Sequence, residues 1–124
     1  MPEYTEQELE FALELRKSLQ LPSVNTPYSR DILAPSSPVC VLAGSTDLSN
    51  VSQIVPTAFI IAACMPRGVP LHHWSASACA DGSAARKGMI YAAMVLAKSG
   101  YRLMTSPVLL EQVKRDFARG GNQF

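Results

Sequence analysis

The chain has 124 residues, with 11 basic and 10 acidic side chains and a formal net charge of +1. This length predicts a single domain over residues 1–124, and the balanced charge, without a basic stripe, argues against nucleic-acid binding. Hydrophobic residues make up 48% of the sequence, which is high for a small domain and indicates that some apolar surface faces a partner.

The first predicted element is a helix over about residues 5–20. Thr5 and Glu8 have the spacing of a capping box, and leucines follow at roughly helical intervals up to Pro22. Prolines, serines and asparagines then dominate residues 21–38, and each proline removes a backbone donor. We therefore expect an irregular connection over this stretch.

Two apolar runs predict buried strands, Val39–Ala43 and Ala58–Cys64. Between them, Thr46 or Asp47 is placed to cap a short helix that continues to Val55. Strand, helix and strand in this order favour a right-handed crossover unit, with functional loops at the carboxyl ends of the strands.

Two further helices complete the predicted elements. One covers Ser83–Ser99 and stops at Gly100. We expect its inner face to pack closely against a neighbour, and that face consists of Ala84, Ala85, Gly88, Met89, Ala92, Ala93, Leu96 and Ala97. The other begins near Ser106–Pro107 and ends at Gly120–Gly121. The expected fold class is therefore α/β, with two or three buried strands packed against about four helices.

His72 is the candidate metal ligand, because it lies in the loop-like segment Pro70–Trp74, where a rigid scaffold can hold an imidazole in place. The alternative is a surface histidine or one that only forms hydrogen bonds. His73 is the weaker candidate, since neighbouring residues of an extended loop point to opposite sides.

The turn Gly44, Ser45, Thr46 and Asp47 is the candidate substrate-binding segment, because a helix amino terminus prefers anions such as a carboxylate. The alternative is that Asp47 only caps the helix. Arg86 and Lys87 are candidates for an anion clamp or, more simply, for solvated charges. No run approaches the roughly 18 apolar residues of a membrane span, and the odd number of cysteines favours reduced thiols in the cytoplasm.

Four motifs occur in a characteristic order: Gly44–Ser52, Val55–Thr57, Pro70–Trp74 and Lys87–Ala97. Together they resemble the C-terminal part of the aminobenzoyl-glutamate hydrolase family, within the di-zinc aminoacylase and carboxypeptidase G metallopeptidase superfamily. The resemblance extends from about Tyr4 to Phe117. It implies the C-terminal segment of a zinc-peptidase-like catalytic domain and an amidohydrolase that cleaves N-acyl amino acids with zinc or manganese.

Residue by residue, the resemblance implies that His72 is a zinc ligand and that Ser45, Thr46 and Asp47 lie at the substrate side of the site. The family's first histidine motif, its bridging carboxylate and its general-base glutamate have no counterpart here, and Arg86 stands where a histidine is expected. A two-metal hydrolase needs these groups. We therefore expect no catalytic residue, no metal bound by this chain alone and no activity of the isolated chain.

Three hypotheses follow for the role of such a chain. It is one part of a split enzyme that docks with a complementary N-terminal half, or a truncated remnant that forms homo-oligomers through the surface that the lost half covered. In the third, it is a module that binds a small molecule without catalysis, through the turn at residues 44–47 and His72.

Overall fold

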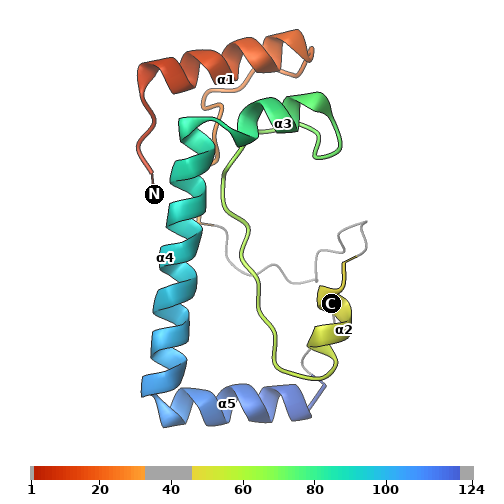
Figure 1. Ribbon diagram of the computed structural model, residues 1–124, viewed down its shortest axis with the longest axis vertical. Coiled ribbons are helices and arrows are strands. Elements are labelled where there is room, and N and C mark those ends of the chain that lie inside the picture. Colours follow the sequence, from red (N-terminus) through yellow and green to blue (C-terminus); the bar gives the residue numbers. More distant parts are fainter. Residues whose placement is uncertain (1, 33–45, 121–124) are drawn as a thin grey trace. The chain divides into compact units, whose positions relative to one another are not determined.

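The computed structural model describes residues 2–32 and 46–120. Helices are the regular elements of these residues (Figure 1): α1 (Glu6–Ser18), α2 (Leu48–Ser52), α3 (Trp74–Ala80), α4 (Ser83–Thr105) and α5 (Pro107–Ala118). The chain divides into two compact units. The first unit comprises Met1–Asp31 and Ile61–Val95, and the second comprises Ile32–Ile60 and Leu96–Phe124.

The expected α/β fold is wrong for the described residues, because these ranges contain no strand. Ala58–Cys64, expected as a buried strand, has no regular structure, and Ile61 within it is 79% exposed. A strand needs a neighbouring chain to accept and donate its backbone hydrogen bonds, and an apolar run does not show whether that neighbour exists. The other expected strand, Val39–Ala43, lies outside the described residues.

The first unit is built on α1, α3 and the start of α4. The capping box of α1 is present as predicted: the Glu8 amide donates to Thr5 Oγ1 over 3.3 Å, and the Thr5 amide donates to Glu8 Oε2 over 2.7 Å. One core cluster joins Tyr4, Ala12, Tyr28 and Ala84, and a second joins Leu15, Val69 and Cys79. These apolar contacts hold α1 against α3 and against the start of α4 (Figure 1).

Two close contacts fix the segments around this core. The rings of Tyr4 and Tyr28 are stacked with centroids 4.2 Å apart. On α4, Gly88 lies close to Ala63 and Cys64, in the irregular segment before α3. A Cβ added at Gly88 would lie 2.7 Å from the carbonyl oxygen of Ala63 and 2.8 Å from Cys64 Sγ. The close packing predicted for Gly88 is therefore confirmed, with this segment as its neighbour.

The helices after residue 70 differ from the prediction in two ways. The seven-residue helix α3, which begins at Trp74, was not among the predicted helices. Its serines and alanines lack the clear apolar period that would have indicated it. Moreover, α4 continues through Gly100 to Thr105 rather than stopping at Ser99. A glycine inside a helix costs only about 1 kcal/mol, which neighbouring helical residues offset.

The second unit contains α2, the last part of α4, and α5. Ser106 caps α5 by accepting a hydrogen bond from the Leu109 amide over 3.3 Å, and Pro107 occupies the first turn, as the sequence predicts. None of the described apolar side chains of this unit is buried. Within residues 2–32 and 46–120, no helix combines the length and the apolar content needed to cross a membrane.

Candidate functional site

The predicted substrate-binding turn is described only in its second half, because Gly44 and Ser45 lie outside the described residues. Thr46 and Asp47 are both exposed and precede α2. Asp47 occupies the N-cap position, but its side chain makes no capping hydrogen bond. Instead, Thr46 Oγ1 accepts a long hydrogen bond of 3.4 Å from the Leu48 amide, so the carboxylate of Asp47 is not engaged as the helix cap.

The two adjacent histidines have different surroundings. His72 lies in the turn before α3 and is exposed. His73 is the N-cap of α3, and its Nδ1 accepts a hydrogen bond from the Ser75 amide over 3.3 Å and lies 2.8 Å from Ser75 Oγ. Both histidines are therefore exposed, but Nδ1 of His73 is engaged by the buried Ser75.

A zinc or manganese site needs three or more protein donors at one place. Across the described ranges, no group of three or more histidine, cysteine, aspartate or glutamate side chains is arranged to hold a metal ion. His72 belongs to the first unit, and Thr46 and Asp47 belong to the second. The described residues therefore do not fit a complete metal site, and any ligand role of His72 requires donors from elsewhere.

Arg86 and Lys87 follow each other at the start of α4 but have different partners. Arg86 Nη1 donates to the Asp81 carbonyl over 2.8 Å and lies 3.5 Å from its carboxylate, and both side chains are largely exposed. Lys87 Nζ lies 2.7 Å from Glu8 Oε2 and donates to the Glu3 carbonyl over 2.9 Å. A solvated charge is the better interpretation for Arg86, whose ion pair with Asp81 is exposed, and is wrong for Lys87, which pairs with the buried carboxylate of Glu8.

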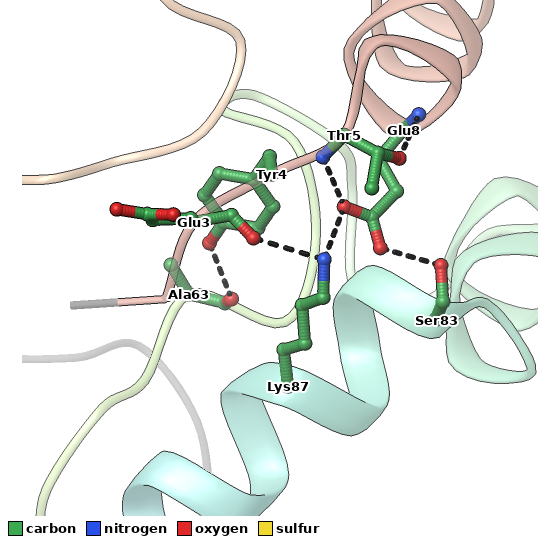
Figure 2. Close-up of polar contacts among 7 residues, drawn as sticks. All are labelled: Glu3, Tyr4, Thr5, Glu8, Ala63, Ser83 and Lys87. Carbon is green, nitrogen blue, oxygen red and sulfur yellow. Dashed lines mark hydrogen bonds and ion pairs between the residues drawn. The ribbon is translucent and has the colours of Figure 1, made fainter.

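The main polar cluster of the first unit is centred on Glu8 (Figure 2). Its carboxylate accepts hydrogen bonds from the Thr5 amide, from Ser83 Oγ and from Lys87 Nζ, and only 7% of the residue is exposed. Ser83 and Lys87 lie four residues apart on α4, so they face α1 from the same side of their helix. The cluster therefore joins the start of α1 to the start of α4.

These donors determine the protonation state of Glu8. Burial favours the neutral acid, but the hydrogen bonds from Lys87, Ser83 and Thr5 and the positive charge of Lys87 together outweigh it, lowering the pKa of Glu8 from 4.5 to about 2. Glu8 is ionised at neutral pH with its oxygens already engaged. Such a carboxylate stabilises the fold and is a poor general base, because accepting a proton would disrupt these hydrogen bonds.

Beside this cluster lies a shallow cleft of about 310 Å³ between α1 and the turn before α4. Phe11, Tyr28, Cys79 and Ser83 are among the residues that line it. Burial raises the pKa of the Cys79 thiol, which disfavours the nucleophilic thiolate. The buried thiol is therefore a weak nucleophile in this structure.

The sequence indicates Glu8 only as the capping-box partner of Thr5. Its contact with Lys87 joins residues 79 positions apart, and such a pairing has no signature in one sequence. A partial signal does exist, because Ser83 and Lys87 have the i, i+4 spacing of one helix face.

Comparison with known proteins shows that the sequence is similar to that of a hydrolase. Over 76 residues, or 61% of this chain, the sequence is 36% identical to a subunit of the p-aminobenzoyl-glutamate hydrolase of Escherichia coli (strain K12). The resemblance indicated by the four sequence motifs is thereby confirmed. No family model matches the chain, and no solved structure matches it.

The matched region is a small part of this relative. The chain spans about 16% of the length of the hydrolase subunit. The name of that protein identifies it as one subunit of an enzyme with several subunits.

Proposed function

We propose that this chain supplies one segment of a metal-dependent amidohydrolase that acts on N-acyl amino acids related to aminobenzoyl-glutamate. The observation that carries the proposal is the 36% identity over 76 residues to a protein named for hydrolysis of p-aminobenzoyl-glutamate. The order of motifs from Gly44 to Ala97 supports the C-terminal part of the catalytic domain as the equivalent segment.

A complementary polypeptide supplies the rest of the enzyme in this proposal. Two observations on the described residues support the need for one. No group of three metal donors is assembled within them, and the second unit buries none of its described apolar side chains. A domain gains most of its stability from burying apolar surface, so a partner that covers the exposed apolar side chains on and around α2 and α5 would complete both the core of the second unit and the active site.

Within the completed enzyme, His72 is the metal ligand that this chain contributes. Its exposed position in the turn before α3 leaves its ring accessible to an ion held by other donors, whereas His73 is occupied as the cap of α3. The turn from Gly44 to Asp47 contacts the substrate, and the exposed Thr46 and Asp47 support that role. Zinc or manganese is the metal that the resemblance implies.

A segment exchange tests this proposal. The matched segment of the E. coli hydrolase subunit is replaced by the corresponding part of this chain, and hydrolysis of p-aminobenzoyl-glutamate is measured in the presence of zinc or manganese. We expect hydrolysis above that of the same protein with the segment deleted, lost in His72→Ala and retained in His73→Ala. A folded exchange protein with no more activity than the deletion, or with equal activity in both histidine variants, would refute the proposed role.

A further inference from the structure

Helix α4 carries an exposed apolar stripe at coiled-coil spacing. Its members follow one another at intervals of four, three, four and three residues: Ile90, Met94, Ala97, Tyr101 and Met104. Met94 is 65% exposed, Tyr101 64% and Met104 82%. Because these residues belong to one continuous helix, their spacing alone aligns them along a single face. An exposed stripe of this kind is suited to packing against a second helix.

The charges of α4 restrict which helix can pack there. The helix contains Arg86, Lys87, Lys98 and Arg102 and no acidic residue. Lys87 is paired with Glu8, but Arg86, Lys98 and Arg102 are exposed. Two copies of α4 packed on each other would bring like charges together, which is unfavourable. Charge complementarity instead selects an amphipathic helix with acidic flanks.

Helix α1 has this character on its outer side. A shallow groove on α1 is formed by Leu13, which is 48% exposed, and by Leu9, which is half-buried against the core, together with Glu6, Glu10 and Glu14. The leucines lie one helical turn apart, and the three glutamates continue along the same side of the helix. At 1.5 Å per residue, α1 is roughly 20 Å long, and the stripe from Ile90 to Met104 is roughly 21 Å long.

We propose that the α4 stripe binds α1 of a second copy of this chain. Leu13 and the exposed part of Leu9 of one copy pack on the stripe of the other, and Glu10 and Glu14 pair with Lys98 and Arg102. A second copy is the occupant because the chain itself carries both complementary surfaces, of matching length and opposite charge. This contact does not depend on the proposed hydrolase role.

Charge reversal tests the contact in the full 124-residue chain. Dissociation constants are measured by sedimentation equilibrium at low and high salt. Reversal on α4 alone, Lys98→Glu with Arg102→Glu, should raise the dissociation constant at least about tenfold, as should Glu10→Lys with Glu14→Lys on α1. An equimolar mixture of the two reversed proteins should restore association.

The matched control is Lys114→Glu with Arg115→Glu on α5, which makes the same charge change on another helix and should leave the dissociation constant unchanged. Circular dichroism verifies that each variant is folded, and Met94→Glu provides a second disruption within the stripe. A chain that stays monomeric at every concentration overturns the proposal. Self-association that is insensitive to both reversals, or is not restored by mixing, overturns it equally.

Discussion

Glu8 and Lys87 form an ion pair of 2.7 Å that connects α1 to α4 across 79 positions of the sequence. Glu8 is buried, and Lys87 is about one-third exposed. The same carboxylate is also the capping-box acceptor of α1, so one side chain both starts a helix and attaches it to another. The first unit therefore depends strongly on the charge of Glu8.

Replacing Lys87 with methionine should destabilise the chain by about 2 kcal/mol, because the buried charge of Glu8 would lose its cationic partner while the aliphatic packing is kept. Urea unfolding followed by circular dichroism measures the change. Lys114→Met is the matched control, since its ion pair with Glu111 is exposed at both ends. The control should change stability by less than about 0.5 kcal/mol. Equal effects of the two substitutions would contradict the role given to Glu8.

Stability should fall steeply in acid because the pKa of Glu8 is lowered from 4.5 to about 2 by folding. A lowered native pKa means that the unfolded chain takes up the proton first as the pH falls. The stabilisation, roughly 3 kcal/mol, is complete above about pH 4.5 and is lost as the pH falls towards 2. Urea midpoints measured across this range should decline less in Glu8→Gln than in the parent chain. Parallel declines would show that Glu8 does not carry the effect.

Gly88→Ala and Gly100→Ala should have opposite effects although both change α4. At position 88 the new Cβ would lie 2.7 Å from the Ala63 carbonyl oxygen, a backbone atom, so we expect a loss of about 2 kcal/mol. At position 100 nothing lies within 4 Å of the new Cβ, and the better helix propensity of alanine should add up to about 1 kcal/mol. Thermal unfolding of the two variants gives the comparison. If Gly88→Ala did not change the stability, the close approach of Ala63 to Gly88 would be contradicted.

Replacing each of the adjacent histidines, His72 and His73, with alanine should affect the stability of the chain differently. His73→Ala removes the acceptor that caps α3 and should cost about 1 kcal/mol, whereas His72→Ala removes an exposed ring and should be neutral within about 0.5 kcal/mol. Thermal unfolding of both variants in the absence of added metal distinguishes them. A destabilising His72→Ala would mean that this ring is needed for the fold and is not available for a ligand.

Local signals in the sequence predicted several helix ends correctly. Thr5 with Glu8 indicates the start of α1, and Ser106 with Pro107 indicates the start of α5, because each cap depends on residues within one turn. The strand at Ala58–Cys64 was wrong because its existence depends on a partner that apolar content does not reveal.

The sequence predicted less of the candidate site than of the helix ends. Four ordered motifs, one of which contains His72, led to the hydrolase resemblance, which the comparison confirms. The ligand role of His72 remains a prediction. The engagement of Lys87 with Glu8 was missed, because a contact between distant segments is determined by how the helices pack. The inner face predicted for α4 was correct for Ala84 and Gly88. It was wrong for Met89, Leu96 and Ala97, which are exposed.

The central claim is that this chain is one part of an amidohydrolase and needs its complement for catalysis. The most direct measurement is hydrolysis of p-aminobenzoyl-glutamate by the purified 124-residue chain with added zinc or manganese. We predict no hydrolysis above the rate with buffer and metal alone. Turnover that a chelator abolishes, and that His72→Ala reduces, would show a complete metal site within this chain and would contradict the account.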